Sequence, residues 1–479
     1  MASHAHAAEH EQGHSHYPAD MWVFPQSEKV APDLVGRTVA AAPRFKMWML
    51  IAGVLAVVGI IGFIARAATD GFDEYGPWGY YMAVFSYLFM ITGAAPLVGL
   101  AFRFTKSHWR RPLSRVSELF GLLGVVNVLL FIPLLFVLPP LANPQVDHGE
   151  LAVRRTLWIA GPWGAPQLWD LLGVVALAVM GLVILWLSAV PDLAGAKLAA
   201  TGWRRKLYTM LACRWCGAKR QWHIQKAGLA LLGGFYFMTL IFVQFLIATD
   251  YGMSLVPGWK DSIFPPLYTV ISFQSSLATI LIIMFILRRW GGYQEYIGVS
   301  LFWSASKILL GLTLLWTYHL WAFFITFWYG RMPVEQNILK YFLFESYGAV
   351  FAANVVFSFL LPFVSILLWN RFRKTDWGPA LAGCFILVGT LAFNIRIFVG
   401  SFNAGDVYAL ALERVPPPVY PDLWDIFIVV GCIGLAAFVY LAAMRVFPVL
   451  SIWEVKEGAL YQRMERFMKG RYLVLAKPE

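Results

Sequence analysis

The chain has 479 residues, of which 59% are hydrophobic and only 14% are charged, and its mean hydropathy is +0.64. Soluble domains carry roughly 25% charged residues, so this composition excludes an ordinary soluble protein and indicates the membrane class. The net charge of +11 does not require nucleic acid as a partner. Anionic lipid of the inner leaflet is the usual partner of Lys and Arg in the loops of a membrane protein.

The first 46 residues are polar and contain no cleavable signal peptide, so we expect an amino-terminal arm that stays in the cytoplasm. Five of the nine histidines lie in its first sixteen residues. Such a tract could bind a divalent metal, or it could be a disordered tail that binds none.

Ten apolar segments are long enough to cross the hydrocarbon core, which needs about 20 helical residues. They show no strand alternation, so the sequence predicts an all-α polytopic domain at 47–447 and not an outer-membrane barrel. A basic tail at 448–479 follows, and Trp453, Glu454, Lys456 and the LYQRMERFMKGR run could form a short amphipathic helix on the membrane surface or against a partner. The predicted spans are 47–68, 79–102, 117–138, 168–190, 226–248, 265–287, 297–320, 345–369, 378–399 and 423–447.

The basic residues predict the topology. Of the 38 Lys and Arg residues, 29 fall on the side of the amino terminus, six on the opposite side and three within the predicted spans. Cytoplasmic loops carry the excess of Lys and Arg, so both termini are expected in the cytoplasm, as in a bacterial inner-membrane protein.

Cysteine and histidine usage argues against a resident redox centre. Cys384 and Cys432 lie in predicted spans, and Cys213 and Cys216 form one C-x-x-C that is a weak metal or redox signal by itself. Only His319 lies in a span, whereas a membrane haem commonly takes a pair of helix histidines. We therefore expect no haem or metal bound by this chain, and electron transfer would need cofactors on partner subunits.

The segment 249–268, TDYGMSLVPGWKDSIFPPLY, interrupts two very apolar runs. Its prolines restrict φ, so we expect a stiff loop that carries acids and aromatic rings. Asp250 would end the fifth span at the outer surface, and Asp170 would begin the fourth span at the same surface. Because consecutive antiparallel helices usually neighbour each other, the two carboxylates are expected to face one shallow pocket.

Two carboxylates at the outer surface suit the oxidation of a quinol, which releases two protons and two electrons. A carboxylate can accept a hydrogen bond from the quinol hydroxyl and then take its proton. Asp170 and Asp250 are therefore the candidate proton acceptors, and Trp169 and Trp259 are candidate walls for the ring. The alternative is that both acids are helix-terminal residues in the wet headgroup layer, with Trp in the interfacial belt.

Other ionisable groups near or within spans are candidates for a proton path because burying them is costly. Lys307 lies near the middle of the seventh span, Arg396 lies towards the outer end of the ninth, and Glu345 opens the eighth. Lys307 could instead bond structurally between helices, Arg396 could extend to the interface, and Glu345 could be an interfacial acid.

Several motifs resemble the NrfD/PsrC-like membrane subunits, and most closely the quinone-interacting subunits of alternative complex III. The similarity covers roughly residues 75–375, and the loop at 254–266 is its most specific part. The matching runs are Ser254-Leu-Val-Pro257-Gly258-Trp259, Ser262-Ile-Phe264-Pro265-Pro266, Leu168-Trp169-Asp170, Val190-Pro191-Asp192-Leu193-Ala194 and Trp328-Tyr329.

The resemblance implies two four-helix bundles, here roughly 79–248 and 265–399, with one flanking span at each end. It implies a transient quinone or quinol near the first bundle, with Asp170 and Asp250 at matched positions. It also implies an iron–sulfur subunit, a cytochrome c subunit and a second NrfD-like subunit as partners. In such subunits histidines occur near the positions of Phe136, Gln244 and Lys260, which are therefore further candidates for the quinone pocket.

If those histidines are needed for quinol oxidation, this chain binds quinone differently or not at all. The alternative is a non-catalytic NrfD-like subunit that anchors partners or carries protons. A third alternative, a secondary transporter, would need broken helices around a polar site at mid-membrane.

Overall fold

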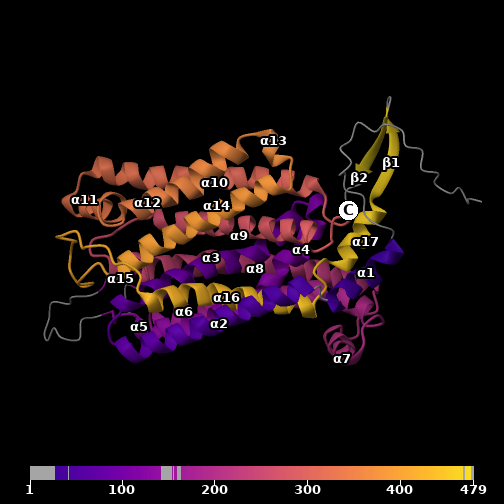
Figure 1. Cartoon of the computed structure of the whole chain (residues 1–479), viewed down its shortest axis with the longest axis horizontal. Helices are drawn as coiled ribbons and strands as arrows, with labels where there is room; N and C mark the ends of the chain where they lie inside the picture. The colour runs from indigo at the N-terminus through magenta and orange to yellow at the C-terminus, as the bar shows by residue number, and fades with distance from the viewer. Residues whose placement is uncertain are drawn as a thin grey trace, which may run out of the picture.

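The computed structural model describes residues 27–40, 43–141, 154, 156–158, 163–467 and 470–475. Long helices run side by side along the longest axis of the molecule (Figure 1). We call the end that carries α1, α7, α17 and the β1–β2 hairpin the tail end, and the end that carries α11 and α15 the loop end. The histidine-rich tract at 1–16 lies outside the described residues.

Nine helical segments of the described chain are long and apolar enough to cross a membrane. This confirms the predicted all-α, polytopic class. Their main helices are α2 (Pro43–Asp70), α3 (Gly79–Phe104), α4 with α5 (Arg111–Glu118, Leu123–Val137), α6 (Gln167–Ala196), α8 (Lys219–Asp250), α9 (Phe264–Arg289), α10 (Val299–Gly330), α14 (Trp377–Asn394) and α16 (Leu423–Val446).

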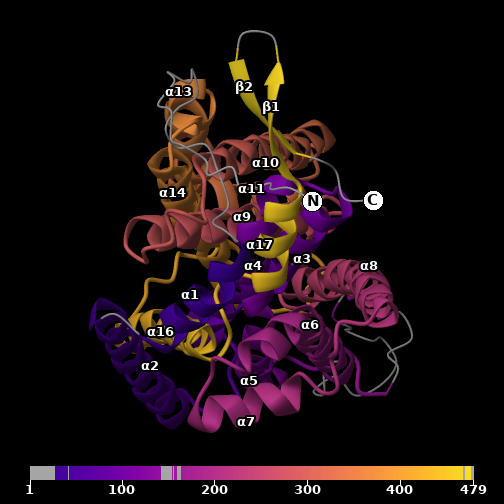
Figure 2. The same cartoon turned by 90° about the vertical axis from the view of Figure 1, so that its right-hand side faces the viewer.

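A bent pair of helices is a candidate for a further crossing. Pro333–Phe344 and Gly348–Val364 meet at an angle of 65°. The helix α1 before the first span packs against α17 after the last span (Figure 2), so these two described elements lie at the same end of the bundle. An even number of crossings is needed for this, and counting the bent pair as one span gives ten.

Shorter elements connect and cap the spans. Pro333 begins α11, and a π-helical turn at Lys340–Phe344 leads to the bend. The shorter elements are α1 (Ser27–Val39), α7 (Gly202–Leu211), α11 (Pro333–Leu339), α12 (Gly348–Val355), α13 (Asn370–Arg373), α15 (Gly400–Phe402), α17 (Ile452–Leu460), β1 (Gln462–Phe467) and β2 (Gly470–Leu475).

The helices form two groups with a flanking pair. Helices α3, α5, α6 and α8 pack together, as do α9, α10, α12 and α14, and α3 packs on α9 where the groups meet. Helices α2 and α16, the first and last spans, lie against each other along their length (Figure 1).

Glycine lets α2 and α16 approach closely. A Cβ added at Gly431 would lie 2.0 Å from the Gly59 Cα, and one added at Gly434 would lie 2.5 Å from the Leu55 Cβ. Small residues at a helix–helix contact allow van der Waals packing of the backbones, which stabilises association within lipid. At the loop end of the pair, Arg66 bridges Asp425 at 2.7 Å.

Gly431→Leu is expected to destabilise the protein by about 1–3 kcal/mol, because the leucine overpacks the α2–α16 contact. Unfolding in mixed micelles measures this change. Gly311→Leu is the matched control, since a Cβ at Gly311 meets nothing within 4 Å. Equal stability of the two variants would contradict a tight glycine contact.

Several predicted boundaries were wrong. The third span begins at His108 and not at 117. The charged residues before 117 can belong to the span because they form buried ion pairs, such as that of Arg115 with Asp192. The seventh span runs on to Gly330, ten residues past the predicted end, and is followed closely by Pro333. The eighth is bent instead of straight, and Glu345 lies in the bend, where the helical pattern is interrupted.

The termini also differ from expectation. Ser27–Val39 forms helix α1 within the arm expected at 1–46. The amphipathic helix expected in the tail ends at Leu460, and Gln462–Phe467 and Gly470–Leu475 instead pair as antiparallel strands, with Gln462 opposite Leu475. A hairpin pairs the backbone groups of this polar run within the run itself.

Candidate functional site

Two acids predicted to share a site lie buried at the loop end of the first bundle. Asp250 is the last residue of α8 and is fully buried, and its Oδ2 accepts a hydrogen bond of 2.9 Å from the Trp158 indole. Its carbonyl oxygen accepts hydrogen bonds from Ser254, at 2.8 Å, and from the Arg154 guanidinium, at 3.3 Å. Oδ1 of Asp250 has no partner among the described residues.

Asp170 lies in the first turn of α6 and is also fully buried. It is close enough to Asp250 and to Arg154 for their charges to act on it. In the described part of the chain, neither of its carboxylate oxygens has a hydrogen-bond partner. The helices α6 and α8 pack against each other, as the neighbour rule predicts.

One arginine faces this pair of acids. Arg154 is 1% exposed, and burial lowers the pKa of its guanidinium, which the charge of Asp250 raises in turn. Arginine remains protonated in proteins, so the cluster holds one cation and two carboxyl groups. The Tyr251 hydroxyl is buried beside them without a hydrogen-bond partner in the described chain. Unpaired buried polar groups of this number are unusual and indicate a ligand or water site.

Aromatic rings surround the acids. The Tyr251 ring lies edge-on to Phe131 at 5.5 Å between centroids, and the Trp158 ring lies 6.2 Å from that of Trp169. Trp169 is 45% exposed and donates a hydrogen bond to the Trp163 carbonyl. Trp169 therefore lies at the exposed rim of the cluster.

Three candidate pocket residues lie apart from the acids. Phe136 is 70% exposed on α5, and Lys260 is exposed in the loop. Gln244 is buried, but its amide donates to Ser272 on α9, at 2.5 Å. These three positions, where the family resemblance expects histidines, do not form one pocket with Asp250.

Trp259 belongs to the second bundle. Gly258, with φ +80°, turns the chain so that Trp259 packs on Phe264 and Phe342, at 4.7 and 5.1 Å between ring centroids. Together with Arg396 these residues line a cavity of about 10 Å³, roughly the space that one water centre needs. The prediction that Trp259 and Trp169 wall one site is therefore wrong.

The three residues predicted for a proton path lie on different elements and in different surroundings. Lys307 is exposed on α10, and its ammonium lies 3.7 Å from the centre of the Trp303 ring. This contact is within α10, whereas a bond to another helix was expected. Glu345 is exposed in the bend of the eighth span. Arg396 alone is buried, at 2% exposure.

Arg154, Trp158 and Tyr251 were missed as site residues. Arg154 and Arg155 are neighbours on the side predicted to carry only six basic residues, and this pair was an available signal. Trp158 and Tyr251 gave no signal, because Trp and Tyr are common at membrane interfaces.

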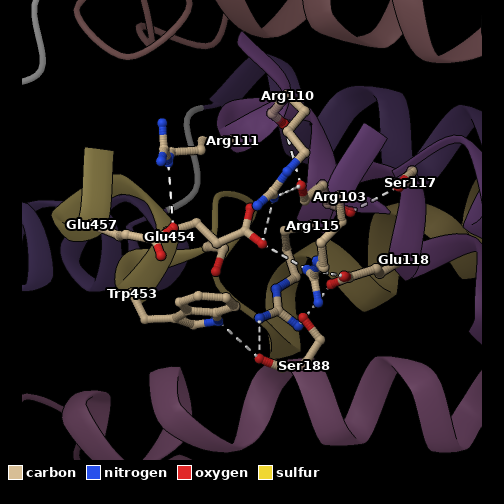
Figure 3. A network of polar contacts seen from close by, with 12 residues as sticks. Arg103, Arg110, Arg111, Arg115, Ser117, Glu118, Ser188, Trp453, Glu454 and Glu457 are labelled. Atoms are coloured by element: carbon tan, nitrogen blue, oxygen red, sulfur yellow. Dashed lines mark hydrogen bonds and ion pairs between the residues drawn. The ribbon is translucent and has the colours of Figure 1, made fainter. Parts of the chain in front are cut away.

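A network of buried ion pairs lies at the tail end (Figure 3). Glu454 on α17 binds Arg103 at 2.6 Å and Arg110 at 2.8 Å. Arg115 on α4 binds Asp192 at 2.7 Å, and Asp192 Oδ1 accepts a hydrogen bond from the Trp453 backbone. These contacts fix α17 against α4 and α6, so Asp192, part of a motif in the family resemblance, has a structural role here.

The fold defines a polytopic, all-α membrane protein with nine to ten spans, with a buried cluster of acids at one end of its first bundle. Neither a scan against models of protein families nor a search of curated proteins finds a match to this chain. Its membership of the NrfD/PsrC-like family therefore stays a prediction from the motifs.

Proposed function

We propose that this chain is an NrfD/PsrC-like membrane subunit of a respiratory oxidoreductase and that it oxidises quinol at the Asp170–Asp250 cluster. The observation that supports this most is the convergence of two buried carboxyl groups with three unpaired oxygens between them. Carboxylate oxygens accept hydrogen bonds, and a quinol offers two hydroxyl donors.

In the proposed reaction the two O–H bonds of the quinol break, and the product is the quinone. Asp250 Oδ1 and the Asp170 carboxylate accept the two protons, which then pass to the water at the loop end. The two electrons pass to iron–sulfur and haem groups on partner subunits, for which this chain offers the docking surface. The positive charge of Arg154 acts on both carboxyl groups and partly opposes the burial that disfavours their ionised forms.

The proposed orientation follows from the basic residues. The tail end carries the terminal elements and the Lys- and Arg-rich loops, so we place it in the cytoplasm of a bacterium. The loop end then faces outwards, where protons from quinol would be released. The proposed partners are an iron–sulfur subunit, a mono- or multihaem cytochrome c and a second NrfD-like subunit.

A specific cavity favours a second candidate, a proton-conducting subunit without quinol chemistry. A cavity of about 10 Å³ in the first bundle is lined in part by Thr92, Asn127 and Tyr236. The residues of α6 that line this cavity lie at 174–178. They come after Asp170 and before Ser188, whose carbonyl oxygen accepts a hydrogen bond from the buried Arg115. A water there could connect titratable groups towards both ends of the bundle.

A photoreactive quinone analogue added to the intact native complex tests the first candidate against the second. We expect it to label the peptides that contain Trp158, Asp170 and Tyr251, because these residues surround the unpaired carboxyl groups. Excess unlabelled quinone should suppress the labelling. Labelling confined to other subunits, together with proton permeability of vesicles that contain this chain, would favour the proton conduit.

A further inference from the structure

A buried cation lies in the second bundle. The Arg396 side chain, in the π-helical turn Ile395–Val399, is 2% exposed. No charged group among the described residues acts on its guanidinium, and the enclosed Nε has no hydrogen-bond partner among them. Its guanidinium lies 5.0 Å from the Phe351 ring centre and 5.6 Å from that of Phe393. The stabilisation that a cation gains from such ring contacts is small compared with the free energy needed to bury its charge.

A second donor belongs to a residue that lines the same cavity as Arg396. The Trp259 indole N–H is buried and unpaired among the described residues, and Trp259 and Arg396 line one cavity. The rest of the lining is apolar, and includes Phe264, Phe342 and Phe393. Two donors and no acceptor require a ligand that brings acceptor oxygens, and the uncompensated charge requires that the ligand be an anion.

The size of the cavity limits what enters it. At about 10 Å³ it takes a single oxygen-sized group, so the body of the ligand must lie outside. Leu320 and Phe323 of α10 line the cavity, and Trp321 beside them is 60% exposed on the surface of the same helix. An apolar chain could cover that face.

We propose that Arg396 and Trp259 hold the oxyanion of an amphipathic ligand, a carboxylate or phosphate headgroup whose apolar chain lies along α10. A fatty acid or an anionic phospholipid of the surrounding membrane has this chemistry. The site lies in the second bundle, so it is independent of quinol chemistry at Asp250. A free inorganic anion shares the headgroup chemistry but lacks the chain, and the test separates the two sources.

Native mass spectrometry of the protein purified from membranes in mild detergent tests this site. We expect one retained anionic lipid, and Arg396→Gln is expected to reduce its retention about tenfold or more, because hydrogen bonds to charged groups are strong. Arg414→Gln, which removes an exposed arginine of the adjoining loop, should leave retention unchanged. A folded Arg396→Gln protein that keeps the lipid, or a wild-type protein that binds none, would overturn the proposal.

Two further measurements keep the proposal testable if Arg396→Gln does not fold. Trp259→Phe keeps a ring but removes the N–H donor, and should weaken lipid retention several-fold, whereas Arg396→Lys keeps the charge and should retain part of it. Delipidated protein is then titrated separately with palmitate, with phosphatidylglycerol in nanodiscs and with inorganic phosphate. We expect palmitate or phosphatidylglycerol to raise the thermal stability of the protein. Equal stabilisation by phosphate alone would indicate a site for free anions and would refute the proposal of a lipid ligand.

Discussion

Asp250→Asn is expected to lower quinol oxidation by the intact complex about 10²- to 10⁴-fold, the usual contribution of a positioned acid or base. The amide is nearly the same size and can still accept the Trp158 hydrogen bond, but it cannot take a proton. Turnover is measured with a soluble quinol and an artificial acceptor. Copurification of partner subunits shows whether the complex still assembles.

Glu413→Gln is the matched control for Asp250→Asn, because it removes an exposed carboxylate from a loop at the same end of the bundle. It should leave the rate of oxidation within about twofold of wild type, as surface changes away from a site commonly do. Normal turnover of Asp250→Asn in an assembled complex would refute the proposed quinol chemistry. The scaffold or proton-conduit alternative would then remain.

Glu454→Gln is expected to destabilise the protein by about 3–5 kcal/mol, the usual cost of removing one partner from a buried ion pair. Glu454 is fully buried, and without its charge Arg103 and Arg110 lose their common counter-ion. The helix α17 should detach more readily from the tail end. Chemical unfolding in mixed micelles gives the free energy, and protease cleavage after α16 reports detachment.

Glu457→Gln is the control on the same helix, since Glu457 makes one contact of 3.5 Å with Arg111 and its side chain is 18% exposed. It should cost less than 1 kcal/mol, as weak pairs near the surface do. Equal destabilisation by the two variants would contradict the central role of Glu454.

The same carboxylate predicts a pH dependence. Burial raises the pKa of Glu454, but the charges of Arg110 and Arg103 outweigh it and lower the pKa to about 2, from an ordinary value of 4.5. Such a group binds fewer protons when α17 is docked, so its contribution is complete above pH 4.5 and is lost as the pH falls towards 2. Glu454→Gln should flatten the change in stability over this range.

The hydrophobic pattern was sufficient to predict an all-α membrane protein with about ten spans, of which the described chain has nine to ten, because a long apolar helix satisfies its own backbone groups in lipid. It failed where charges are compensated by distant residues. Arg110 and Arg115 lie within a helical segment that the pattern began at 117, because their partners, Glu454 and Asp192, come from other helices.

The sequence also predicted some features of the loop at 249–268 and not others. Its prolines and the position of Asp250 at a helix end were readable from the chain, and so was the approach to Asp170, since sequential helices are neighbours. The sequence could not predict that Trp259 lies in the second bundle with Arg396. That position depends on packing against Phe342, which is 83 residues further along the chain.

The sequence by itself determined the class of protein, the approximate positions of most spans and the placement of the two acids at one end of neighbouring helices, all of which depend on local hydrophobicity and on the order of helices. The tertiary structure alone decided which polar groups have partners. Asp425, which follows Trp424 as Asp170 follows Trp169, forms an ion pair of 2.7 Å with Arg66, whereas Asp170 has no hydrogen-bond partner in the described chain. Two equal motifs thus differ in chemistry because long-range contacts, and not neighbours in the chain, set the environment of a buried charge.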